Sequence, residues 1–152
     1  TTFARRAAER IRSESLAASC VSVFVRTNPF DKKSAYYSNG ASRTLSHPTH
    51  DSITIIETAL LLTKRIFKNN YQYKKAGVLL SGLCDKSEIQ ETLFEKNYNQ
   101  NSDLMSAIDA INYRYGRDTL QMASECKVGN WKQKRENCTR NYTTQIDRLL
   151  LV

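Results

Sequence analysis

The spacing of apolar side chains changes from a helical to a strand period within the first part of the chain. In residues 1–14, apolar side chains recur at helical spacing and arginines fill the other face, which predicts an amphipathic helix with a basic exterior. Residues 20–26 then alternate and are rich in β-branched side chains, which predicts a strand. The side chains expected to face the helices are Val21, Val23 and Val25. The opposite face would carry Ser22, Phe24 and Arg26.

Three further segments continue the pattern. Residues 41–45 are strand-like and follow a turn or bulge expected at Asn39-Gly40. Residues 53–67 carry a dense apolar stripe after several possible N-capping residues, which predicts a helix. Residues 73–81 are mostly apolar in their second half, which predicts a third strand. The order helix, strand, strand, helix, strand predicts an α+β fold in which both helices pack on one face of an antiparallel sheet.

The composition changes after this first unit. Residues 85–101 are polar, rich in Asn and Gln and without sustained periodicity, which is typical of a tether. A helix is expected from Ser102 to Gly116, and the rest of the chain suggests short strands or irregular structure. The predicted organisation is therefore a domain at 1–84, a flexible tether at 85–101 and a partly helical C-terminal extension at 102–152.

Net charge narrows the classes of partner. Lysine and arginine number 23 against 15 acidic residues, a formal charge of +8, so nucleic acid is the leading partner and a merely soluble basic protein is the alternative. No signal peptide or apolar run of membrane-spanning length is evident, so we expect a soluble, intracellular protein without a membrane partner. The cysteines have no metal-binding or disulfide spacing and are expected to be reduced thiols; they are Cys20, Cys84, Cys126 and Cys138.

Catalytic chemistry finds little support in the residue pattern. Phosphoryl transfer needs carboxylates that hold metal ions, but Asp103 and Asp109 are too far apart to share one helix face. His47 and His50 with Asp51 could form a metal or hydrolytic site, and a small metal-dependent nuclease using both histidines is the enzyme alternative. We reject that site because these residues belong to a helix-entry turn, and we expect no catalytic residue, metal or cofactor in this chain.

The outer face of the predicted sheet is the first candidate binding site. A small twisted sheet that carries serine, arginine and lysine can lie in a DNA groove and bond phosphates. The residues expected to bind DNA in this way are Arg26, Ser42, Arg43, Lys74 and Lys75. The alternative is a solvated outer face without a partner.

The predicted tether contains a second candidate, Gln90-Glu91-Thr92-Leu93-Phe94. The glutamine can bond backbone groups of a partner while Leu93 and Phe94, three and four residues later, enter an apolar pocket. The alternative is one turn of amphipathic helix folded back on the domain, since a five-residue pattern with two fixed residue classes fits both structures.

Several motifs, taken in order, resemble the C-terminal part of UmuC-type proteins, the catalytic subunits of bacterial DNA polymerase V within the Y-family of translesion DNA polymerases. The motifs are Val25-Arg26-Thr27-Asn28-Pro29-Phe30, Tyr36-Tyr37-Ser38-Asn39, Pro48-Thr49 with Asp51-Ser52, Tyr73 with Lys75-Ala76-Gly77-Val78, and Asn141-Tyr142-Thr143-Thr144. The resemblance implies a little finger domain, which in that family is a four-stranded sheet backed by two helices. Three strands are visible here, and the fourth would precede the first helix.

The resemblance also implies function. The little finger holds primer-template DNA while other domains, absent here, carry out Mg²⁺-dependent error-prone synthesis in SOS mutagenesis, so this chain would be a non-catalytic part of a polymerase. It implies that Lys74 and Lys75 meet phosphates, and that Gln90, Leu93 and Phe94 anchor a sliding β-clamp peptide in which Glu91 replaces a usual leucine. The extension would contact partners such as the processed UmuD dimer or the RecA filament, in the bacterial cytoplasm at the nucleoid.

A protein-binding function is the alternative to DNA binding. The basic sheet face could belong to a protein-interaction domain that binds an acidic partner and not DNA.

Overall fold

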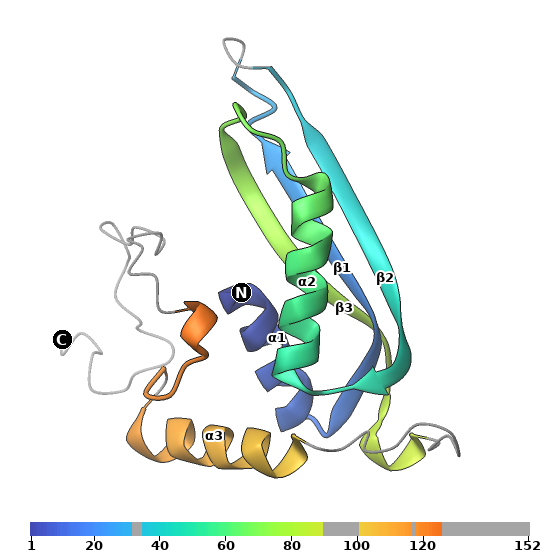
Figure 1. Ribbon diagram of the computed structural model, residues 1–152, viewed down its shortest axis with the longest axis vertical. Helices are drawn as coiled ribbons and strands as arrows, with labels where there is room; N and C mark the ends of the chain where they lie inside the picture. Colours follow the sequence, from blue (N-terminus) through green and yellow to red (C-terminus); the bar gives the residue numbers. More distant parts are fainter. Residues whose placement is uncertain (32–34, 90–100, 117, 126–152) are drawn as a thin grey trace, which may run out of the picture.

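The computed structural model describes residues 1–31, 35–89, 101–116 and 118–125 (Figure 1). The helices are α1 (Thr2–Ser13), α2 (Ser52–Ile66) and α3 (Ser102–Tyr115), and the strands are β1 (Leu16–Thr27), β2 (Ser38–Thr49) and β3 (Tyr73–Asp85). Two short 3-10 helices, η1 (Lys86–Glu88) and η2 (Ala123–Glu125), follow β3 and α3. The predicted order of helices and strands is confirmed.

The described strands form one antiparallel sheet in the order β2-β1-β3. The central strand β1 therefore hydrogen-bonds on both sides, whereas β2 and β3 are the edges of the sheet that the described strands form. Both α1 and α2 contribute to the hydrophobic core with β1, so they cover the same face of the sheet (Figure 1). The predicted α+β class, an antiparallel sheet with two helices packed on one face and helical structure after it, is confirmed.

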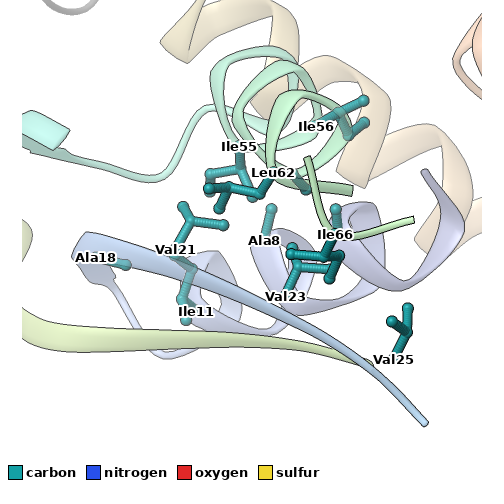
Figure 2. Close-up of a cluster of buried hydrophobic side chains, with 12 residues drawn as sticks. Ala8, Ile11, Ala18, Val21, Val23, Val25, Ile55, Ile56, Leu62 and Ile66 are labelled. Atoms are coloured by element: carbon teal, nitrogen blue, oxygen red, sulfur yellow. The ribbon is translucent and has the colours of Figure 1, made fainter. Parts of the chain in front are cut away.

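The core lies where alternate side chains of β1 meet the two helices. Val21, Val23 and Val25 are at most 5% exposed and belong to one buried cluster with Ile55 and Leu62 of α2. Figure 2 shows Val21 below Ile55 and Leu62, and Val23 below Ile66. The remaining core residues are Ala4, Ala8, Ile11, Ala18, Ile56, Ala59 and Ile66. Full burial of a Val or Ile side chain contributes about 1.5–3 kcal/mol, so this layer provides much of the folding free energy. The inward face predicted for β1 is confirmed.

The strands are longer than their local patterns predict. The turn or bulge expected at Asn39-Gly40 is wrong, because Asn39 pairs with Val25 and Gly40 with Phe24 without interruption. Pairing with the long central strand supplies backbone hydrogen bonds that the local sequence pattern does not report. Pro48 lies within β2, which is compatible with its position because β2 is an edge strand.

Helix α2 begins at one of the expected capping residues. Asp51 is the N-cap, and its carboxylate accepts hydrogen bonds from the backbone N–H groups of Ile53 at 3.1 Å and Thr54 at 3.3 Å. Burial alone would raise the pKa of Asp51, but these bonds, together with those from the Thr54 hydroxyl and the Asn101 amide, hold it below its ordinary value. The carboxylate is therefore charged at neutral pH and stabilises the start of the helix.

Aromatic residues fasten the opposite end of α2. The Tyr37 hydroxyl donates to the carbonyl of Ile66 at 2.7 Å, and the Tyr37 ring stacks against Tyr71 with centroids 4.8 Å apart. The Tyr73 hydroxyl bonds both backbone groups of Lys68 at 2.9 Å. These tyrosines therefore have a structural role at the turn between α2 and β3.

Helix α3 is attached to the helical layer through an arginine of α1. The Arg12 guanidinium donates to both carboxylate oxygens of Asp109, at 2.6 Å and 2.9 Å. It also donates to the carbonyl of His50 at 2.9 Å and the hydroxyl of Ser52 at 2.8 Å. Met105 of α3 is 1% exposed. One part-buried cation thus joins α1, α3 and the start of α2.

The first residues of the predicted tether are ordered secondary structure. Asp85 ends β3 opposite Leu16, and Lys86–Glu88 forms η1. The backbone N–H of Lys86 donates to the carbonyl of Ser15 at 2.9 Å, which holds this turn beside the end of α1. The strand therefore runs past the boundary that the composition suggests.

Candidate nucleic-acid interface

The face of the sheet turned away from α1 and α2, which we call the open face, carries the side chains that alternate with the core valines. Residues paired across antiparallel strands point to the same face, so the pairing identifies the members of each row. Centred on β1, the rows are Cys20 with Thr44 and Ser81, Ser22 with Ser42 and Leu79, Phe24 with Gly40 and Gly77, and Arg26 with Ser38 and Lys75. The open face is therefore mostly polar along β2, apolar at Phe24 and Leu79, and basic at the row of Arg26 and Lys75.

The basic end consists of two cations in direct opposition. Arg26 of β1 is paired with Lys75 of β3, and Lys75 is exposed. Like charges directly opposite each other on one face of a sheet are unfavourable. None of the open-face residues named above is acidic. The two cations therefore create a positive potential that an anionic ligand would relieve.

Hydroxyl groups lie two rows away. The Ser22 and Ser42 side chains are hydrogen-bonded to each other at 2.8 Å and exposed. Each hydroxyl has remaining donor or acceptor capacity, so this pair can bond a phosphate oxygen or a sugar hydroxyl.

Two of the expected DNA-binding residues differ in position from the rest. Arg43 is paired with Val21, and its neighbours Ala41 and Leu45 pack against the core, so Arg43 lies on the helix side of the sheet and is exposed at its edge. Ser42 and Arg43 cannot share the open face, because successive side chains of a strand point to opposite faces. Lys74 is exposed at the irregularity where pairing shifts between Arg26 and Thr27.

The centre of the open face holds an aromatic side chain between two glycines. Phe24 is 47% exposed and is paired with Gly40 on β2 and Gly77 on β3. A Cβ atom added to Gly77 would lie 2.5 Å from Cε1 and Cζ of the Phe24 ring, so the ring occupies the space above that glycine. Leu79 in the adjacent row is 59% exposed. The sequence indicated Phe24 as an apolar residue on this face, but not its glycine neighbours.

The second candidate site lies outside the described residues. Gln90, Leu93 and Phe94 belong to the segment 90–100, so their interpretation as a partner-binding peptide stays a prediction.

The histidines and aspartates considered for catalysis have other surroundings in the fold. His50 is 8% exposed, and burial, followed by the Lys86 and Arg12 charges, lowers its pKa below the ordinary value. Asp109 is bound by Arg12. Within the described ranges, no group of three or more His, Cys, Asp or Glu side chains could hold a metal ion. The described helices also include none that is long and apolar enough to span a bilayer.

The ion pair between Arg12 and Asp109 could not be predicted from local sequence patterns. They are 97 residues apart in the sequence, and each looks like an ordinary charged residue on the polar side of its helix. Only the packing of α3 beside α1 brings them together.

Comparisons with known proteins cover nearly the whole chain. Residues 1–93 match the impB/mucB/samB family C-terminal domain, and residues 102–152 match a domain of unknown function, DUF4113. The chain is 36% identical to Protein UmuC of Salmonella typhimurium over 99% of its own length and 36% of that protein's. It is also 36% identical to Protein ImpB of Salmonella typhimurium and Protein MucB of Escherichia coli, over 94% and 95% of its length and 34% of each relative's. The chain thus spans about a third of these relatives.

Proposed function

The chain belongs to the impB/mucB/samB family through its C-terminal domain, and on that premise we propose that it is the non-catalytic, DNA-holding region of an error-prone Y-family translesion polymerase. The resemblance to the C-terminal part of UmuC-type proteins is confirmed by these matches. The polymerase activity, its Mg²⁺ and its role in SOS mutagenesis belong to the proposal for the whole protein, at the nucleoid in the bacterial cytoplasm.

The pairing of Arg26 with Lys75 on the open face is the main support for DNA binding. Two cations are held side by side on a sheet face without an acidic neighbour in the rows described above, although their mutual repulsion opposes folding. A DNA backbone supplies closely spaced phosphates that would convert this repulsion into attraction. The serine hydroxyls two rows away would bond further backbone oxygens. These contacts are independent of base sequence, as a lesion-tolerant polymerase requires.

Salt dependence of DNA binding tests this proposal. Each phosphate contact that is lost lowers the slope of log K against log salt by about 0.9, so Lys74→Ala with Lys75→Ala should flatten the slope by about two. The matched control is Lys64→Ala with Arg65→Ala, which removes the same charge from exposed positions at the end of α2, on the helix side of the sheet.

The two double variants should be compared with wild type on primed and fully duplex DNA. A slope that is unchanged in the Lys74/Lys75 variant, or equally flattened in the Lys64/Arg65 control, would remove the open face from the DNA interface. Salt-sensitive binding to an acidic protein in the absence of any DNA binding would favour the protein-interaction alternative.

We also propose that Gln90, Leu93 and Phe94 tether the polymerase to the sliding β clamp. The support is the spacing of a glutamine and an apolar pair, with the family membership of the chain. A labelled peptide of residues 86–97 should bind purified clamp, and the same peptide with Leu93→Ala and Phe94→Ala should not. Equal binding of both peptides, or no binding of either, would contradict the tether.

The region 102–152 would contact partner proteins of the polymerase, for which the processed UmuD dimer and the RecA filament are the candidates. Co-sedimentation of the 152-residue chain with each partner tests this, with a chain ending after residue 101 as the control.

A further inference from the structure

The central aromatic residue of the open face has no side chain beside it in its own row. Its two paired neighbours are Gly40 and Gly77, and the Phe24 ring leans over Gly77 with nearly half of its surface, 47%, exposed. A Cβ atom at position 77 would lie 2.5 Å from the end of the ring, so this exposed ring would have to rotate away from its present position. The row therefore accommodates a large flat side chain and leaves much of it uncovered.

Exposure of this ring costs free energy that burial would recover. An aromatic side chain contributes a large apolar area, and removing this area from water is favourable. Leu79, in the adjacent row, is 59% exposed and extends the apolar area across the open face. The apolar area of Phe24 and Leu79 differs from a general protein-docking surface, because the row on the other side of Phe24 is the cationic pair of Arg26 and Lys75. An apolar contact immediately beside two cations matches a ligand that alternates flat apolar groups with anions.

We propose that Phe24 is a stacking platform for an unpaired base of single-stranded DNA, with Arg26 and Lys75 holding the neighbouring phosphate. Side chains two residues apart on one face of a strand are about 6.7 Å apart, so the base and the phosphate would come from adjacent positions of one nucleotide chain. Stacking of bases on aromatic side chains is a common mode of single-strand binding on sheets. This inference rests on the proposed function, since it concerns the same face.

A single strand is favoured over a duplex by the geometry of the bases. In a duplex both faces of each base are covered by its stacked neighbours, and the grooves expose only edges and backbone. A ring on a sheet face can stack only where a base is free. We therefore expect the middle of the open face, around Phe24, to bind unpaired DNA, whereas the basic end can bind either single-stranded or duplex DNA.

The test compares the 152-residue chain and its variants on a fluorescent 20-nucleotide oligothymidine and on a 20-base-pair duplex, at several salt concentrations. Loss of about 1–3 kcal/mol of stacking corresponds to roughly 5- to 150-fold weaker binding, so Phe24→Leu should weaken oligothymidine binding by that factor. Its salt slope should equal that of wild type, and its duplex affinity should stay within about twofold. Phe30→Leu, at a residue 88% exposed in the segment between β1 and β2, is the matched control and should change neither.

A second variant gives a direct readout. In a Trp131→Phe background, Phe24→Trp introduces a single tryptophan whose fluorescence should be quenched by oligothymidine and not by duplex, while affinity is retained. Thermal unfolding of each variant shows that it is folded.

Wild-type oligothymidine affinity in folded Phe24→Leu would overturn the inference. An equal loss on oligothymidine and duplex would also overturn it, because it would indicate a groove contact and not stacking. Failure of this inference leaves the proposed function standing if the Lys74/Lys75 variant still flattens the salt slope. Absence of DNA binding by the wild-type chain would defeat both.

Discussion

The contact between Arg12 and Asp109 makes a quantitative prediction about how the third helix is held. The side chain of Arg12 is 9% exposed and donates to Asp109, to the carbonyl of His50 and to the hydroxyl of Ser52. Arg12→Met keeps an unbranched apolar stem at this position but removes every one of these donors. The variant therefore leaves a carboxylate, a carbonyl and a hydroxyl without the partner that satisfies them.

The size of the effect follows from the burial of the two partners. Breaking a fully buried ion pair costs about 3–5 kcal/mol. The side chain of Asp109 is 32% exposed, and it lines a cleft of about 630 Å³ together with Arg12 and Tyr113, so water can reach the abandoned carboxylate. We therefore expect Arg12→Met to lower the free energy of unfolding by about 2–3 kcal/mol, less than for a fully buried pair.

A double-mutant cycle isolates the pair from its surroundings. Urea unfolding of wild type, Arg12→Met, Asp109→Asn and the double variant should give a coupling energy of about 1–2 kcal/mol. The control cycle is Arg10 with Glu14 on the same helix, a pair 3.4 Å apart whose side chains are 82% and 54% exposed. That exposed pair should couple by no more than about 0.5 kcal/mol. Equal coupling energies in the two cycles would refute the argument that Arg12 anchors α3.

Four further predictions follow from the surroundings of single residues. Asp51→Ala should destabilise the protein to urea by about 1 kcal/mol through loss of the N-cap. The folded pKa of Asp51 lies below its ordinary value of 3.8, so the stabilisation that the carboxylate gives the fold is present above that value and is lost as the pH falls through the folded pKa. Asp51→Asn should therefore reduce the loss of stability in acid. Parallel curves of unfolding free energy against pH for the two proteins would contradict this. Gly77→Ala should displace the exposed Phe24 ring, because the added Cβ would lie 2.5 Å from its far end, and should change the free energy of unfolding by no more than about 1 kcal/mol since the ring can rotate. Unchanged NMR signals of the Phe24 ring in this variant would disprove the contact. Arg43→Ala should weaken DNA binding less than Arg26→Ala, because Arg43 lies on the helix side of the sheet; the reverse order in a gel shift would refute the face assignment.

Much of the fold could be predicted because its elements have strong local periods. The alternation along β1 predicts which side chains are buried, and Val21, Val23 and Val25 are indeed in the core. The apolar stripe of α2 and its acidic N-cap place that helix to within one residue. These features depend on neighbours within a few positions, which is the range that a periodic pattern reports.

The candidate site could be predicted only in part, because membership of a face depends on register. Arg26 and Ser42 were expected on the open face and lie there, whereas Arg43 does not. A chain segment such as 41–45 shows that alternate residues face opposite ways, but not which set faces the helices. Pairing with Val21 decides that question, and this partner lies on another strand.

By itself, the sequence determines the α+β class, the order of the helices and strands, the inward face of β1 and the excess of positive charge, because each is a local or additive property. The tertiary structure alone decides that Arg26 stands opposite Lys75, that Phe24 lies between two glycines, and that Arg12 meets Asp109 across 97 residues. Strand register and helix docking are set by the sum of contacts along whole elements. For that reason no short stretch of the sequence contains them.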